Sequence, residues 1–226
     1  MNRATVSRTR ASLAAGLVAG AGSVSQAGIV VSTFDIDTEG WVVSDSMLPP
    51  NEISTAGALH VLGFGNPGGF ISVPDTFDPD EAAFVAPAKF YGNKTGAIGG
   101  TLLTFDRRVW DPPHNNNPQQ VDFAYDVTIS GNGVTLGYDL PPTTLRWSSY
   151  SVPIDVGMGW TNLDTDLPAT IGEITAVLSA LDDLRIRASL NDIGVNSGLD
   201  NVVLVPAPVS IGLLTLAGVI CSRRRR

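Results

Sequence analysis

The chain has 226 residues and a formal net charge of −8, with 14 basic and 22 acidic residues. All 22 acidic residues lie between positions 28 and 205, where only 7 of the basic residues lie, so this region carries a net charge of −15. Such a surface repels nucleic acid and anionic membranes, because both need positively charged partners. The only cysteine is Cys221, so a domain formed by this region depends on a hydrophobic core rather than on disulfides.

The first 27 residues have the features of a secretory signal peptide. Arg3, Arg8 and Arg10 make the start of the chain positive, and residues 13–24 form a short apolar stretch rich in Ala, Gly and Val. Ser25-Gln26-Ala27 follows and supplies the small residues that a signal peptidase requires at its cleavage site. This order of parts predicts export and cleavage after Ala27.

Residues 28–204 are predicted to form one mainly β domain, within the usual size range. Short apolar or alternating runs, separated by Gly, Pro and Asn, predict strands. The predicted strands are residues 28–34, 58–62, 70–73, 84–90, 99–105, 121–130, 134–139, 149–153, 184–188 and 199–204. Their lengths and spacing predict a β-sandwich.

Two local signals inside this region are stronger than the rest. Asn132-Gly133 lies between two predicted strands, and this pair accepts positive φ at both turn positions, so it predicts a tight hairpin. Apolar residues from Ile171 to Leu181 recur at helical spacing, which predicts one short helix. Thr170 and Glu173 form a capping box at its start.

Three carboxylates near the start of the domain suggest a metal site. Asp35, Asp37 and Glu39 are alternate residues, so on an extended segment they share one face. Calcium takes six to eight oxygen ligands, and such a row supplies several of them. The sequence therefore predicts a calcium site here, and the alternative is an acidic edge strand without metal.

The C-terminal segment has three parts in a fixed order. Val205-Pro206-Ala207-Pro208 precedes an apolar run from 209 to 221, and Arg223 to Arg226 end the chain. From Val205 to Cys221 the segment has 17 residues, the lower limit of the roughly 17–25 needed to cross a bilayer, and the arginines favour the cytoplasmic side. This pattern predicts a short transmembrane segment. It could belong to a sorting signal that is later removed, and the alternative is a simple tail anchor.

The order of these parts resembles the PEP-CTERM sorting signal of exopolysaccharide-producing bacteria, with Ala207 where that family usually has Glu. The resemblance implies an exosortase-type processing enzyme as a partner and cleavage at Pro206, Ala207 or Pro208. It also implies transient anchoring in the inner membrane, followed by release to the cell surface or secretion.

Residues 34–204 resemble the laminin B (domain IV) family in the order of their landmarks. These are residues 34–41, 68–71, 87–93, 99–105, Trp147, Trp160, 178–181, 184–187 and 199–202. The resemblance implies a jelly-roll β-sandwich, akin to carbohydrate-binding modules and galactose-binding-like domains, with a non-enzymatic extracellular role. In such folds the first and last strands are often neighbours, so Asp200 and Asn201 are expected to complete the calcium site with Asp35.

Tryptophans are candidates for contacts with sugars. Trp41 and Trp147 lie beside predicted strands and are expected in the core. Trp110 and Trp160 lie beside Gly- or Pro-rich loops, and an exposed indole can stack on a sugar ring. The alternative is that all four are core residues.

Catalytic motifs are absent from the sequence: no nucleophile elbow, zinc-binding helix or phosphate-binding loop is found. The resulting prediction is a non-enzymatic, exported surface or matrix protein that acts in adhesion or biofilm and binds polysaccharide or a matrix protein. The alternatives are a purely structural biofilm component without a specific ligand and, less favoured, a polysaccharide hydrolase.

Overall fold

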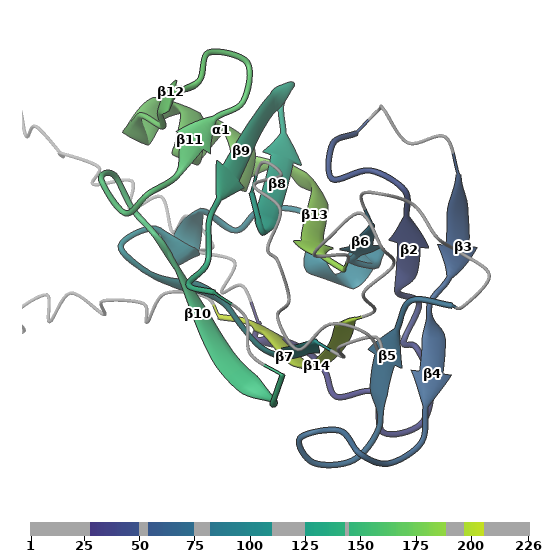
Figure 1. Ribbon diagram of the computed structural model, residues 1–226. Helices are drawn as coiled ribbons and strands as arrows, with labels where there is room; N and C mark the ends of the chain where they lie inside the picture. The colour runs from purple at the N-terminus through teal and green to yellow at the C-terminus, as the bar shows by residue number, and fades with distance from the viewer. Residues whose placement is uncertain are drawn as a thin grey trace, which may run out of the picture.

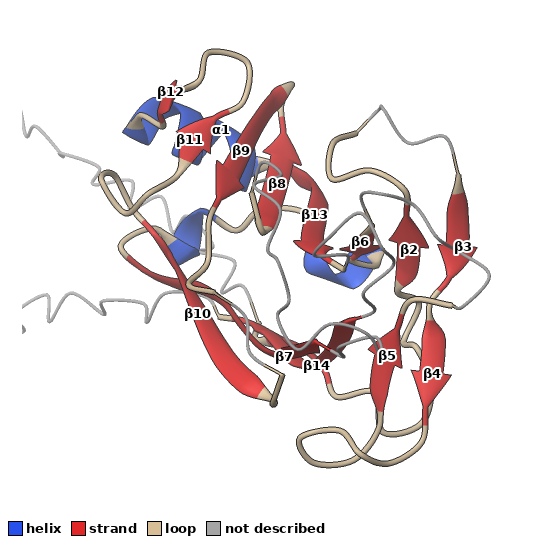
Figure 2. Ribbon diagram, in the orientation of Figure 1, coloured by secondary structure: helices blue, strands red, loops and turns tan. Residues whose placement is uncertain are grey.

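Two antiparallel sheets face each other in the computed structural model and form a jelly-roll β-sandwich with one α-helix (Figures 1 and 2). The structure describes residues 28–49, 54–74, 82–109, 125–142, 145–188 and 197–205. This architecture confirms the predicted fold class.

The six-stranded sheet is built around the last strand of the domain. Its order is β10 (Ser148–Ile154), β7 (Gly100–Val109), β14 (Ser197–Leu204), β5 (Phe70–Ser72) and β4 (Leu59–Val61), and β1 (Val30–Ser32) pairs with the end of β14. Val30 pairs with Leu204 and Ser32 with Val202, so the first and last strands are neighbours, as the sequence suggested.

The eight-stranded sheet contains several strands of only two or three residues. Its order is β12 (Leu167–Pro168), β11 (Thr161–Asn162), β9 (Val134–Tyr138), β8 (Val127–Gly131), β13 (Leu181–Arg187), β6 (Ala83–Val85), β2 (Val42–Ser44) and β3 (Thr55–Gly57). The prediction of one strand over residues 84–90 is wrong. β6 ends at Val85, and a 3-10 helix, η1 (Ala88–Phe90), follows Pro87, which has no N–H to continue the ladder.

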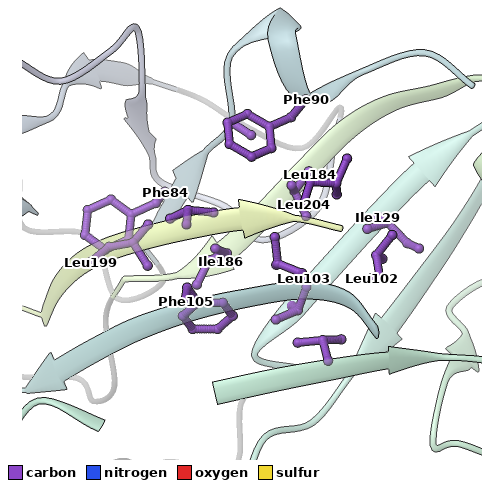
Figure 3. Close-up of a cluster of buried hydrophobic side chains, with 14 of the residues drawn as sticks. Phe84, Phe90, Leu102, Leu103, Phe105, Ile129, Leu184, Ile186, Leu199 and Leu204 are labelled. Carbon is purple, nitrogen blue, oxygen red and sulfur yellow. The ribbon is translucent and has the colours of Figure 1, made fainter. Parts of the chain in front are cut away.

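A hydrophobic core fills the space between the sheets (Figure 3). Leu103, Phe105, Arg107 and Val109 are alternate residues of β7 and are all buried, because alternate side chains of a strand point to one face. The opposite sheet contributes buried apolar residues that include Phe84, Ile129, Leu184 and Ile186. One charged residue, Arg107, therefore stands in an otherwise apolar row.

A buried ion pair joins the two sheets at this arginine. Arg107 Nη1 and Nη2 both lie 3.1 Å from Asp126 Oδ1, and Asp126 directly precedes β8. The other carboxylate oxygen of Asp126 accepts a hydrogen bond from Leu140 N at 3.0 Å. The pair explains why β7 continues through Asp106-Arg107-Arg108, where the sequence predicts that the strand has already ended.

Both strong local predictions are confirmed. Asn132 and Gly133 have φ values of 52° and 74° in the turn between β8 and β9. Helix α1 (Ile171–Ser179) begins at Thr170, and both hydrogen bonds of the capping box are present. The buried face of α1 packs against β8 and β9, and a second short 3-10 helix, η2 (Thr95–Ala97), lies nearby.

Candidate functional site

The loop between β4 and β5, residues 62–69, contacts the middle of β14 at Asp200. Trp147 Nε1 donates a hydrogen bond to Phe64 O at 2.8 Å, and Gly65 N donates one to Gly68 O at 2.9 Å. Asn66 N donates to Asp200 Oδ2 at 2.6 Å. The loop is therefore tied to both β10 and β14, and Figure 1 shows it at the lower edge of the molecule.

Carboxylate and amide groups from four segments meet beneath this loop. We name Asp35, Asn66, Asp106, Asp200 and Asn201 the acid–amide cluster. Asp106 Oδ2 accepts hydrogen bonds from Asn201 Nδ2 at 2.8 Å and from Asn66 Nδ2 at 3.3 Å. Asn201 Nδ2 also donates to Asn66 O at 2.5 Å. The two amides thus link the loop to β7 and β14.

Oxygen atoms converge on the glycines of the loop. A β-carbon at Gly65 would lie 2.8 Å from both Asp200 Oδ2 and Gly68 O, and it would collide with Gly69 O. A β-carbon at Gly68 would collide with Asp35 Oδ1, and Gly68 has a φ of 96°. Only glycine fits at these positions, and the result is a cradle of carboxylate and carbonyl oxygens.

Asp200 is the most perturbed acid of the cluster. Its side chain is fully buried, and burial raises the pKa of its carboxyl to about 6 from the ordinary 3.8, with a further contribution from the charges of Asp106 and Asp35. Hydrogen bonds from Asn66 N and Asn201 N act in the opposite direction. A cation beside Asp200 would relieve the repulsion among these carboxylates.

The structure brings some of the predicted metal ligands together but not all of them. Asp35, Asp200 and Asn201 lie at the acid–amide cluster. Glu39 turns away, because it forms an ion pair with Lys89 and accepts hydrogen bonds from Thr33 N and Phe34 N. Burial by itself would raise the pKa of Glu39. The hydrogen bonds from Lys89, Phe34 N and Thr33 N and the charge of Lys89 outweigh it and lower this pKa.

The row of three carboxylates does not form, because residues 35–37 bend and Glu39 has a φ of 49° instead of an extended backbone. Asp37 is exposed and accepts a hydrogen bond from Glu39 N at 2.6 Å. Within the six described ranges, no group of three or more His, Cys, Asp or Glu side chains is arranged to hold a metal ion. A metal at the cluster would therefore need backbone carbonyl oxygens as further ligands.

The aromatic candidates from the sequence are corrected by the structure. Trp160 is only 3% exposed, because it packs against Tyr138 and donates a hydrogen bond to Pro153 O at 2.7 Å. It cannot stack on a sugar in this state. Trp147, expected in the core, is half-buried and contacts Phe70 edge to face. Trp110 lies outside the described residues.

Phe64 is the functional candidate that sequence reasoning missed. Its side chain is 86% exposed at the tip of the β4–β5 loop, next to Gly65 of the oxygen cradle. Its φ of 65° is unusual for a bulky residue. The sequence signal that could have indicated it is an aromatic residue between two glycines, Gly63 and Gly65.

No helix in the described ranges is long and apolar enough to cross a membrane. This finding corrects the predicted localisation, because a C-terminal transmembrane anchor is not supported. The segments on which the predictions at the two ends rest lie outside the described residues. They are residues 1–27, which include Ala27, and residues 206–226, which include Pro206, Ala207 and Pro208.

Comparisons with known proteins agree with this architecture. The structure is similar to the L4b domain of human laminin alpha-2, with a TM-score of 0.59 and 14% sequence identity, over 79% of this chain and 97% of that domain. A family 11 carbohydrate-binding module from Clostridium thermocellum, solved with a beta-1,3-1,4-mixed-linked tetrasaccharide, matches with a TM-score of 0.41 and 18% identity, over 80% and 88% of the two chains. The family described as Laminin B (Domain IV) matches residues 83–213, more than half of the sequence. The chain therefore belongs to the laminin B (domain IV) family.

Proposed function

We propose that this protein is a non-enzymatic extracellular binding domain that binds a neutral polysaccharide at the β4–β5 loop. The observation that carries the proposal is the exposed ring of Phe64 beside the acid–amide cluster. An aromatic ring can cover the apolar face of a sugar, while carboxylates and amides take its hydroxyl groups. Membership of the laminin B (domain IV) family supports a binding role outside the cell.

Charge selects neutral over acidic polymers. The region 28–205 carries a net charge of −15. Four of its seven basic residues are buried, namely Lys94, Arg107, Arg185 and Arg187, and so are three of its described acids, namely Asp106, Asp126 and Asp200. The exposed surface therefore remains strongly acidic. It repels uronic acid polymers in the same way as it repels nucleic acid.

Replacing Phe64 by alanine is expected to weaken polysaccharide binding by roughly 10- to 100-fold, because burial of such a ring contributes about 1.5–3 kcal/mol. A glycan array with neutral and uronic acid polymers, with and without calcium, would identify the ligand, and titration with that ligand would measure the loss. Met158→Ala, an exposed apolar residue of another surface, is the matched control.

Two results would contradict this function. The absence of any glycan signal with or without calcium would favour a purely structural matrix component. Release of reducing ends from a bound polysaccharide, lost on replacing a specific carboxylate pair, would instead indicate a hydrolase.

We also propose that calcium binds at the oxygen cradle, with Asp35 and Asp200 as carboxylate ligands and Gly68 O and Gly69 O as carbonyl ligands. The support is the convergence of these oxygens around Gly65 and Gly68, since calcium prefers carboxylate and carbonyl oxygens. A bound calcium ion would neutralise the crowded acids and hold the β4–β5 loop against β14.

Removal of calcium with EDTA is expected to lower the melting temperature by about 5–10 °C. A ligand present at 100 times its dissociation constant stabilises the folded state by about 2.7 kcal/mol, and each kcal/mol shifts the melting temperature of a domain of this size by about 2–4 °C. Differential scanning calorimetry with EDTA and with excess calcium measures the shift.

Asp35→Ala and Asp200→Ala should each abolish this response to calcium. Asp37→Ala should retain it, because Asp37 is a neighbouring acid that contacts Glu39 N and not the cradle. An unchanged melting curve of the wild-type protein on chelation would count against the metal.

A further inference from the structure

A second surface, far from the β4–β5 loop, exposes four large apolar side chains. Val156 and Met158 are each 51% exposed, Leu167 is 62% exposed and Ile171 is 50% exposed. We name these four residues the hairpin patch. They come from the loop after β10, from β12 and from the start of α1, which Figure 1 shows at the opposite corner of the view from the β4–β5 loop.

Strand pairing brings these segments together. Thr161 pairs with Pro168 and Asn162 with Leu167 in the β11–β12 hairpin. Ala169 N donates a hydrogen bond to Trp160 O at 2.8 Å, which continues the pairing beyond the hairpin. Residues just before Trp160 therefore lie beside residues just after Ala169, which places Met158 near Ile171.

Side-chain hydrogen bonds between the hairpin and α1 hold the segments of the patch in place. Asn162 Nδ2 donates to Glu173 Oε1 at 2.6 Å, which ties the hairpin to α1. The other oxygen of Glu173 completes the capping box with Thr170. These bonds, from Thr170 above all, lower the pKa of Glu173, so this carboxylate stays charged beside the patch. The apolar side chains are thus presented on a fixed frame.

The segments that carry the hairpin patch contain acidic but no basic residues. The sequence contains no Lys, Arg or His from position 147 to 184. The same stretch contains acidic residues on both sides of the patch, and Asp164 and Asp166 are exposed at the tip of the hairpin. Asp155 directly precedes Val156 and is partly exposed. A partner of the patch would therefore meet the acidic side chains of Asp155, Asp164 and Asp166.

We propose that the hairpin patch docks a polypeptide segment in which basic side chains flank apolar anchor residues. Exposed apolar side chains with a polar rim mark interaction sites on soluble domains. The four side chains are aliphatic or thioether groups without an aromatic ring, which suits apolar side chains of a protein better than a sugar face. The acidic side chains of Asp155, Asp164 and Asp166 complement lysines and arginines, and they repel nucleic acid and anionic membranes.

The small size of the patch implies weak and transient binding. Four half-exposed side chains cover far less than the area of a standard stable interface, about 800 Å² on each partner. The charges should therefore contribute mainly to the rate of association and to partner choice, and their effect should fall with salt.

A peptide titration against the full-length protein tests the proposal. The probe is a 12-residue peptide of alternating leucine and lysine, compared with a serine–lysine peptide and a leucine–glutamate peptide of equal length. Fluorescence anisotropy at about 0.15 M and about 0.5 M salt measures binding, where the screening length falls from about 8 Å toward a few ångström. We expect binding of the leucine–lysine peptide at least tenfold tighter than of either other peptide, and weaker binding at the higher salt.

Two triple variants localise the site. Met158→Ser, Leu167→Ser and Ile171→Ser together should weaken binding of the leucine–lysine peptide at least tenfold. The matched control replaces three exposed apolar residues elsewhere on the domain, Ile29, Ile36 and Leu62, by serine and should leave binding of this peptide unchanged. Circular dichroism establishes that both variants are folded.

A charge variant provides an independent measurement. Asp164→Asn with Asp166→Asn should weaken binding several-fold at low salt and reduce its dependence on salt. Equal losses in the two triple variants would overturn the proposal, as would equal affinity for the serine–lysine and leucine–lysine peptides, because either result means general electrostatic attraction. Polysaccharide binding at the β4–β5 loop is tested by glycan binding instead. Each proposal can therefore be contradicted without affecting the other.

Discussion

Replacing Asp126 by alanine is expected to lower the free energy of unfolding by about 3–5 kcal/mol, because it leaves a buried arginine without its carboxylate. Arg107 is fully buried and Asp126 is 2% exposed, and the two are 3.1 Å apart. The carboxylate also accepts the Leu140 N–H, which would lose its partner. Unfolding in urea, followed by fluorescence, measures the change.

The control is Asp164→Ala, which removes an exposed acid of the same kind and should change stability by less than about 0.5 kcal/mol. Removing both charges, with Arg107→Met and Asp126→Leu, should restore much of the loss, because a well-packed apolar pair avoids the desolvation of the ions. If Asp126→Ala and Asp164→Ala cost the same, the ion pair does not couple the sheets.

The second large effect concerns the pH dependence that Asp200 gives to stability in the presence of EDTA. The pKa of its carboxyl is about 6 in the folded state, against an ordinary 3.8. Between about pH 4 and pH 6 the folded protein therefore keeps a proton that the unfolded chain has lost. Stability falls as pH rises where the folded state binds more protons, so this group destabilises the fold progressively across that window, by at most about 1.4 kcal/mol per pH unit.

Asp200→Asn should remove this contribution. In EDTA, the wild type is expected to lose stability relative to Asp200→Asn as pH rises from 4.5 to 6.5. Above pH 6.5 the difference in the free energy of unfolding should be constant. The groups that face Asp200 are Asp106 and Asp35, with the amides of Asn66 and Asn201. Urea unfolding at several pH values measures the difference, with Asp164→Asn as the control that should show no such change.

A constant difference between wild type and Asp200→Asn across this pH range would mean that Asp200 is ionised throughout. If calcium binds at the oxygen cradle as proposed, excess calcium should reverse the trend, since the ion would bind the ionised carboxylates. Its apparent affinity is therefore expected to increase as pH rises through about 6.

Local chemistry explains the features that the sequence predicted well. The turn at Asn132-Gly133 and the helix start at Thr170 each depend on a few adjacent residues, whose conformational preferences do not need the rest of the fold. The alternation of apolar residues likewise predicted most of the longer strands, because the core face of a strand repeats every second residue. The fold class followed from these signals together.

Elements fixed by pairing with distant segments were not predictable in the same way. The sequence analysis predicted no strand at β2, β3, β11 or β12, which have two or three residues each and form hydrogen-bonded pairs with neighbouring strands. β7 continues through charged residues because Asp126 neutralises Arg107 from the opposite sheet.

The candidate site shows the same division. The sequence by itself determined an acidic, disulfide-free β domain, and its resemblance to the laminin B (domain IV) family implied that Asp35, Asp200 and Asn201 are neighbours. Only the tertiary structure decided that Lys89 withdraws Glu39, that Trp160 is buried, and that Asn66 meets Asp200 across 134 residues of sequence. These side-chain partners are far apart in the sequence and meet only when the two sheets pack. The contacts that stabilise them are therefore not visible in any short stretch of sequence.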